Sequence, residues 1–288
     1  MTEIQNYLAP TRLDQALDCL KDGEATILAG GTDLMPQSQA GKLKFKRTLM
    51  NIRRIPELIG VAPQGGDICI GALTTITELL DNPLVRRHLP VLADACNHFA
   101  SDQIRNCATL GGNICNASPA GDTLIPLLVL DAQVELASKV KARLIWRRLP
   151  LAEFFTGPGK TRRAPNELLV GVRIPLPGPG RVAYFHKFGT RPALDISTIS
   201  IGIAGTLRQG SLSDVRVAFG AVAPTPVRAP LTERALEGRR LDREGIARVA
   251  QTARDEVTPI DDVRASAWYR QELIHNMTKR MLAHVADA

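Results

Sequence analysis

The sequence has no long apolar run and few aromatic side chains. Its 288 residues are 44% hydrophobic, 23% charged and only 4% aromatic, and the first two values are typical of globular proteins. No stretch approaches the roughly 20 apolar residues that a membrane-spanning helix requires. The segment Met1–Asn6 also lacks the basic and then apolar layout of a signal peptide. We therefore expect a globular, cytoplasmic protein without a transmembrane segment.

Cysteine is scarce and scattered. The five cysteines nowhere form a Cys-x-x-Cys pair, which disfavours a disulfide framework, a zinc site and an iron–sulfur site in this chain. We expect buried free thiols at Cys19, Cys69, Cys96, Cys107 and Cys115.

Several motifs that carry chemistry are also missing. The sequence contains no Gly-x-Gly-x-x-Gly, no phosphate-binding loop that ends in Gly-Lys-Ser/Thr, and no Gly-x-Ser-x-Gly. The five histidines are dispersed and form no metal-ligand pattern. The sequence predicts no catalytic residue and no metal ligand, which fits a protein whose bound cofactor performs the chemistry.

The net charge of +7 would permit binding to nucleic acid. The basic clusters Lys42–Arg47 and Arg143–Arg148 are short, and few aromatic side chains are available to stack on bases. We favour solvated strand edges and loops for both clusters and expect no nucleic-acid partner, although a basic nucleic-acid-binding protein remains an alternative.

Two stretches combine adjacent glycines with hydroxyl side chains. They are Ala29–Asp33, with Gly30, Gly31 and Thr32, and Ala108–Asp122, with Thr109, Gly111 and Gly112. Bare backbone of this kind can turn its N–H groups toward a diphosphate, and it can equally form a surface turn. Asp122 could hold a ribose or ring hydroxyl, or cap the helix that follows it.

Hydrophobic periodicity predicts a mixed chain. We expect helices over 11–20, 76–80, 89–99, 124–130, 232–236, 242–256 and 266–285, the first with a capping box of Thr11 and Asp14. We expect strands over 25–29, 48–52, 68–73, 133–137, 143–147, 168–174, 181–188, 198–207 and 215–222. The proline- and glycine-rich segment Pro175–Gly180 suggests a domain boundary.

Taken in order, the motifs resemble the FAD-binding medium subunit of the xanthine dehydrogenase and aerobic carbon monoxide dehydrogenase family. They span nearly the whole chain and are Ala29–Asp33, Thr109–Ile114, Ser118–Asp122, Leu168–Pro175 and Lys187–Arg191, followed by Asp195 and Ile196. The resemblance implies an α+β FAD-binding fold like that of vanillyl-alcohol oxidase (PCMH type), in two α/β subdomains. A C-terminal domain with a three-stranded antiparallel sheet and helices would follow. The expected boundaries are 1–56, 57–176 and 177–288.

The resemblance also implies roles for individual residues. The FAD diphosphate would be held by Ile27, Leu28, Ala29, Gly30, Gly31, Thr32, Asp33 and Leu34, and by Thr109, Gly111, Gly112 and Asn113. Asp122 would bind toward the adenosine half, and Phe99 would pack near the flavin or the adenine. Leu169 would lie close to the isoalloxazine, and Lys187 would contact the cofactor with Arg191 nearby.

The function implied is electron transfer within a molybdenum hydroxylase. FAD would take electrons from a small [2Fe–2S] subunit, which in turn accepts them from a large molybdopterin-binding subunit. The three subunits would assemble as a dimer of heterotrimers. The related subunit of 4-hydroxybenzoyl-CoA reductase carries a cysteine-bearing insertion for a [4Fe–4S] cluster; no such insertion is present here, so FAD alone is expected in this chain. A stand-alone FAD-dependent oxidase or reductase of the same fold is the second alternative.

Overall fold

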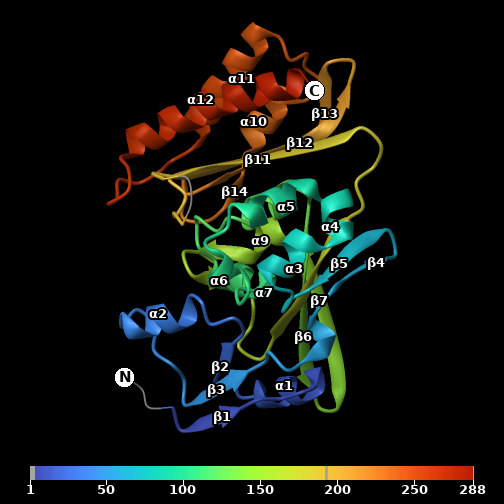
Figure 1. Ribbon diagram of the computed structural model, residues 1–288, viewed down its shortest axis with the longest axis vertical. Coiled ribbons are helices and arrows are strands. Elements are labelled where there is room, and N and C mark those ends of the chain that lie inside the picture. Colours follow the sequence, from blue (N-terminus) through green and yellow to red (C-terminus); the bar gives the residue numbers. More distant parts are fainter. Residues whose placement is uncertain (1–3, 192–193, 288) are drawn as a thin grey trace.

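The computed structural model describes residues 4–191 and 194–287, and its strands form three larger sheets stacked along the long axis of the molecule (Figure 1). The N-terminal sheet is parallel, in the order β1-β3-β2. Its elements are β1 (Asn6–Leu8), α1 (Leu13–Cys19), β2 (Ala25–Leu28), α2 (Leu34–Gln39) and β3 (Thr48–Asn51). The predicted strands over 25–29 and 48–52 are confirmed.

Helix α1 forms where its apolar spacing predicts, but its start differs from the prediction. Leu13, Ala16 and Leu17 are buried on one face. The predicted capping box is wrong, because the Asp14 carboxylate pairs with Arg12 and the Thr11 N–H donates to Gln15. A true capping box opens a later helix, where Thr75 and Glu78 bond each other's backbone N–H groups.

The middle sheet is antiparallel and has the order β4-β5-β10-β6-β7. Its strands are β4 (Val61–Gln64), β5 (Asp67–Gly71), β6 (Gln133–Val140), β7 (Arg143–Pro150) and β10 (Leu168–Pro175). The helices that accompany it are α3 (Ile76–Asp81), α4 (Pro83–His88), α5 (Pro90–Asn97), α6 (Asp102–Arg105), α7 (Leu110–Asn116), α8 (Leu124–Val129) and α9 (Leu151–Phe154). A short 3-10 helix (Pro56–Leu58) and the small hairpin β8 (Phe155–Gly157) and β9 (Lys160–Thr161) complete this part. Alternate strand residues such as Ile70, Val134 and Val172 face the helices and form the largest hydrophobic core.

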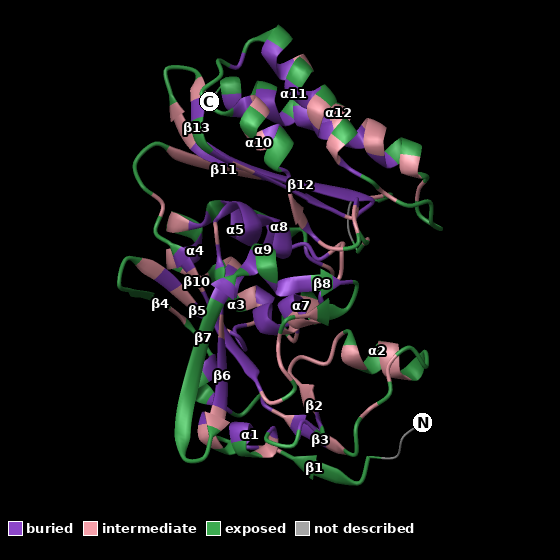
Figure 2. Cartoon of the chain, turned by 180° about the vertical axis from the view of Figure 1, so that it is seen from behind, coloured by how far each residue is buried: buried purple, intermediate pink, exposed green. Residues whose placement is uncertain are grey.

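The C-terminal sheet has the order β11-β12-β13-β14 and lies between two layers of helices (Figure 2). It contains β11 (Arg181–Phe188), β12 (Ile199–Arg208), β13 (Ser211–Gly220) and β14 (Val227–Arg228), followed by α10 (Pro230–Leu236), α11 (Arg243–Glu256) and α12 (Ala267–Ala286). The three predicted strands are confirmed, and the short β14 adds a fourth. Helices α10 to α12 bury a separate core against one face. On the other face, Ile125 of α8 fits against Gly202 and Gly220, where an added Cβ would lie 2.8 and 3.2 Å from it.

The cysteines are free thiols, but only Cys96 is fully buried and the other four are half-buried. Burial raises the pKa of Cys96 to about 12 and that of Cys115 to about 11. In the described ranges, no three His, Cys, Asp or Glu side chains gather into a possible metal site. None of the helices described is both long and apolar enough to cross a bilayer.

Candidate functional site

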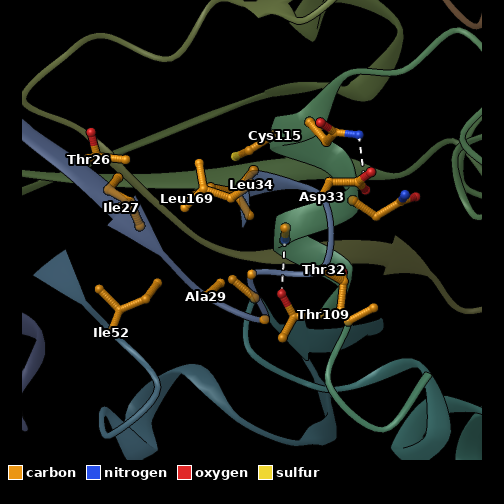
Figure 3. Close-up of a pocket in the computed structure, with 18 of the residues that line it drawn as sticks. Thr26, Ile27, Ala29, Thr32, Asp33, Leu34, Ile52, Thr109, Cys115 and Leu169 are labelled. Carbon is orange, nitrogen blue, oxygen red and sulfur yellow. Dashed lines mark hydrogen bonds between the residues drawn. The ribbon is translucent and has the colours of Figure 1, made fainter. Parts of the chain in front are cut away.

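A cavity of about 450 Å³ lies where the N-terminal sheet meets the middle part of the chain. Both glycine stretches line it, so the two stretches belong to one site (Figure 3). Of the predicted site residues, the following line it: Ile27, Ala29, Gly30, Gly31, Thr32, Asp33, Leu34, Phe99, Thr109, Gly111, Gly112, Asn113 and Leu169.

The first glycine stretch presents free backbone donors. The N–H groups of the five consecutive residues 30–34 donate no hydrogen bond to any group in the part of the chain that the structure describes. Gly31 has a φ of +75°, a conformation that favours glycine. An added Cβ on Gly30 would overlap the Cys107 carbonyl. The turn therefore needs both glycines, and it brings a row of donors to a cavity wall.

The second glycine stretch differs from the prediction. It is not a bare loop: Gly111 and Gly112 lie in the first turn of α7, which Thr109 caps. The N–H groups of Leu110 and Gly111 donate to the carbonyls of Thr74 and Ala72 at 3.0 and 2.8 Å, and Gly112 donates to Thr109 Oγ1 at 3.1 Å. These three N–H groups are therefore already paired within the fold, and the expectation that this stretch holds the FAD diphosphate stays a prediction. The two glycines contribute a wall without side chains.

Polar side chains join the two walls across the cavity. Asn116 Nδ2 donates to Asp33 Oδ2 at 3.2 Å, as Figure 3 shows, and Gln37 Nε2 donates to Asn116 Oδ1 at 2.9 Å. Burial raises the pKa of Asp33. On the same helix, Asn113 Oδ1 accepts from Thr123 at 2.7 Å. The two bonds of Asn116 fix α2 against α7, and the bond of Asn113 ties α7 to the start of α8.

A second cavity of about 360 Å³ continues from the first toward the C-terminal sheet. The two cavities share Asp33, Phe99, Asn113 and Asn116 in their linings. The second also borders Asp122 and the segment 194–196, which connects β11 and β12. Together they form one elongated site that touches all three parts of the molecule.

Asp122 is the centre of a buried polar network beside the second cavity. Its side chain accepts from Lys187 Nζ at 2.6 Å and from Ser197 Oγ at 2.7 Å, and Lys187 Nζ also donates to the His98 carbonyl at 3.0 Å. Asp122 is 8% exposed. Burial raises the pKa of Asp122, and the charge and hydrogen bond of Lys187 oppose that rise. The alternative that Asp122 caps the next helix is wrong, because no side chain caps α8.

The remaining predicted residues lie apart from the cavity linings. Leu28 ends β2 and lines neither cavity, although its side chain lies beside Gly31. The Arg191 guanidinium donates to the Leu194 carbonyl, and Lys187 reaches the site through Asp122.

The sequence prediction missed Asn116, Gln37 and Ser197, whose roles depend on contacts across the fold. It also missed Thr161, the last residue of the short β8–β9 hairpin, and Arg163, which follows it, because no motif reveals that hairpin.

The residues present fit FAD. A row of free N–H groups beside a helix capped by a threonine suits a diphosphate, and the site is long enough to extend on either side of it. Its walls include the apolar side chains of Ile27, Phe99 and Leu169, which suit flat aromatic rings.

Family comparisons agree with this geometry. Residues 2–177 match the model described as "FAD binding domain in molybdopterin dehydrogenase". Residues 183–285 match the model described as "CO dehydrogenase flavoprotein C-terminal domain".

Individual proteins are similar over almost the whole chain. A putative xanthine dehydrogenase FAD-binding subunit of Escherichia coli K12 is 34% identical over 291 residues, covering 100% of this chain and 98% of the relative. The carbon monoxide dehydrogenase medium chain of Hydrogenophaga pseudoflava is 31% identical over 280 residues, covering 96% of this chain and 95% of that one.

Solved structures show the same similarity. A chain of carbon monoxide dehydrogenase from Hydrogenophaga pseudoflava superimposes with a TM-score of 0.91 and 30% identity, covering 97% of this chain and 96% of that one. A chain of quinoline 2-oxidoreductase from Pseudomonas putida 86 gives a TM-score of 0.89 and 27% identity, covering 98% and 96%. The protein therefore belongs to the family of FAD-binding subunits of molybdopterin dehydrogenases, and its cofactor is FAD.

Proposed function

We propose that this chain is the FAD-carrying electron-transfer subunit of a heteromeric molybdenum hydroxylase. The observation that carries the proposal is the row of free N–H groups at 30–34, which opens into a cavity between two parts of a chain of this family. When bound, FAD supplies reversible two-electron chemistry with one-electron steps. The protein binds the cofactor, orients it and encloses it.

We further propose how FAD lies in the site. The diphosphate would contact the N–H groups of residues 30–34 and the neighbouring Thr109, at the centre of the elongated site. We place the isoalloxazine in the second cavity, beside Asp122 and Phe99, because Leu194 and Ile196 at its border are 53% and 51% exposed. An electron carrier must approach its partners, and Leu169 in the first cavity is only 3% exposed. This direction is the reverse of the one that the resemblance implied.

The proposed partners follow from the relatives. Several are named as medium chains or as subunits of dehydrogenase complexes. We propose a large molybdopterin-binding subunit and a small [2Fe–2S] subunit as partners, in a cytoplasmic dimer of heterotrimers. We also retain 1–56, 57–176 and 177–288 as the proposed domains.

Anaerobic titration of the isolated chain, loaded with FAD, tests the electron-transfer role. We expect the flavin absorbance to stay unchanged with organic substrates and to bleach when the reduced iron–sulfur subunit is added. Direct bleaching by a substrate alone would instead establish a stand-alone oxidase or reductase. A chain that takes up no FAD and shifts DNA in a salt-dependent manner would establish a nucleic-acid-binding protein.

Two tryptophan variants test the direction of FAD. Tryptophan stacked near an isoalloxazine quenches its fluorescence. We expect strong quenching in Ile196→Trp, at the border of the second cavity, and little in Thr161→Trp, in the wall of the first. The opposite pattern would restore the direction implied by the resemblance, and it would leave the FAD-binding role intact.

A further inference from the structure

Strand β7 forms one outer edge of the middle sheet, and that edge is uncovered. Seven of its eight residues are exposed, and Figure 2 shows the strand green along nearly its whole length, whereas half of the residues of the neighbouring β6 are buried. The sheet order ends at β7, and no backbone hydrogen bond links its outer side to another part of the described chain. Alternate N–H and C=O groups of β7 therefore point outward without a protein partner.

The exposed side chains of this edge are unusually apolar. Leu144, Ile145 and Trp146 are 41%, 47% and 52% exposed, and Val140, opposite Arg143 in the hairpin, is 54% exposed. Because strand residues alternate, Leu144 and Trp146 lie on one face and Ile145 on the other. Both faces beside the open edge are thus apolar.

The opposite edge of the same sheet is protected in the usual ways. Strand β4 has only four residues, and one of them is Pro63, which has no N–H to donate. Strand β7 has eight residues and no proline before its last position, Pro150. One edge of this sheet resists pairing with another strand, and the other permits it.

The charged side chains of the β6–β7 hairpin indicate which kind of added strand would fit beside β7. Arg147 and Arg148 are already paired with Glu167 and Glu135. Lys141 and Arg143, at the tip of the hairpin, form no ion pair with the described residues. A second copy of β7 would bring only a further Lys141 and Arg143 to this edge as side chains without an ion pair, so self-association offers no charge complement. The vacant edge suits an acidic partner.

We propose that β7 is a docking edge for a partner subunit of the complex, which adds an extended segment with apolar and acidic side chains to the middle sheet. The segment would satisfy the outward backbone groups of β7, cover Ile145 and Trp146, and pair with Lys141 and Arg143. This proposal rests on the proposed function, because it takes the occupant from the same heteromeric enzyme.

Hydrogen exchange, measured in the isolated chain and in the complex reconstituted with the molybdenum and iron–sulfur subunits, tests strand addition. We expect the amides of β7 to exchange at least about tenfold more slowly in the complex, because their opening would require loss of the added strand. The amides of β4 should not change. Equal exchange of β7 in both samples would overturn the proposal.

Substitution of the edge gives an independent test. Ile145→Glu and Trp146→Glu should weaken assembly about tenfold or more. Ile59→Glu, 48% exposed and just before β4, is the matched control and should assemble normally. The FAD absorbance of each variant reports that its fold is intact.

The outcomes separate the two proposals. If the FAD-loaded wild-type chain binds neither subunit, the proposed function itself fails. If the wild type assembles and both glutamate variants assemble equally well, only the docking edge is wrong. An isolated chain that sediments as a dimer, and becomes a monomer in Ile145→Glu, would replace the partner subunit by a second copy.

Discussion

Gly30 shows how one residue joins two distant parts of the chain. Its Cα lies against the backbone of Cys107 and Ala108, so that the first glycine stretch and the residues before α7 touch without intervening side chains. The sequence reveals that both stretches are unusually bare. It does not reveal that one packs on the other, because that contact depends on the relative placement of two sheets.

We expect Gly30→Ala to destabilise the protein by about 1–3 kcal/mol, because the added Cβ would overlap the Cys107 carbonyl and force the two segments apart. FAD occupancy should fall with it. Thermal unfolding and the flavin absorbance of the purified variant measure both effects. Gly178→Ala is the control, since nothing lies within 4 Å of its Cβ position, and an equal loss there would contradict the explanation.

Lys187→Met should make stability strongly dependent on pH. The variant removes the charge and hydrogen bond that oppose the rise in the Asp122 pKa, so that pKa rises further above its unfolded value. The folded state then binds more protons than the unfolded state. The free energy of unfolding therefore falls as pH rises toward the pKa that Asp122 has in the folded state. At alkaline pH the cost approaches the about 3–5 kcal/mol of an unpaired buried charge.

Urea unfolding at several pH values between 5 and 8 measures this effect. The double variant Lys187→Met/Asp122→Asn is the matched control, and its stability should vary with pH as that of the wild type does. A single variant without added pH dependence would show that Asp122 remains accessible to solvent.

At the scale of elements, hydrophobic spacing predicted the long amphipathic segments well. Helix α12 and strands β11 to β13 lie close to their predicted positions. Short elements with unusual composition were missed: α7 was expected to be a loop because glycine disfavours helix, yet Thr109 and the carbonyls of Ala72 and Thr74 hold its first turn. Tertiary hydrogen bonds outweigh propensity at that position.

The start of α12 also depends on a tertiary contact. Arg270, only 3% exposed, donates to Asp262 Oδ1 at 2.8 Å and to the Ile260 carbonyl at 2.9 Å. The hydrogen bond from Arg270 lowers the pKa of Asp262 to about 2. The pKa of Asp262 is therefore below its ordinary value of 3.8. The Arg270–Asp262 pair stabilises the folded state fully above pH 3.8, and this stabilisation is lost as pH falls through about 2.

Asp262→Asn should therefore loosen the segment before α12 at neutral pH, at a cost of about 1 kcal/mol for a partly exposed pair. Limited proteolysis between residues 257 and 266, with denaturant unfolding, measures the change. The loss relative to wild type should shrink as pH falls toward 2. Arg248→Gln removes an exposed pair with Glu244, and it should leave both measurements unchanged.

At the scale of the whole molecule, the buried apolar residues form three hydrophobic cores, and two of these cores bridge neighbouring sheets. Phe185 and Ala218 of the C-terminal sheet belong to the middle core, and Ala137 and Val170 of the middle sheet belong to the N-terminal core. The strand order of the middle sheet could not be predicted, because β10 inserts between β5 and β6, far from β5 in sequence. The approximate succession of most strands and helices was readable from periodicity. Their arrangement in space, and hence the second cavity, was not.

Removal of FAD should lower the melting temperature and expose the N-terminal part of the chain to protease. A ligand that binds only the folded state stabilises it by about 4 kcal/mol at a thousandfold excess over its Kd. In the proposed site, FAD would contact residues of both the N-terminal and the middle part of the chain. Differential scanning calorimetry before and after stripping, with re-addition of FAD, measures the shift. An unchanged melting temperature would mean that the cofactor does not bridge these parts.

The cavity is lined by segments that lie far apart in the sequence, and this has a consequence for biosynthesis. The free N–H groups belong to residues 30–34, the facing helix to residues 110–116, and the border of the second cavity to residues 194–196. A ribosome must therefore release roughly two-thirds of the chain before all walls exist. If FAD lies in this site as proposed, we expect a chain truncated before residue 194 to bind FAD more weakly than the full chain, because one wall of the second cavity would be missing.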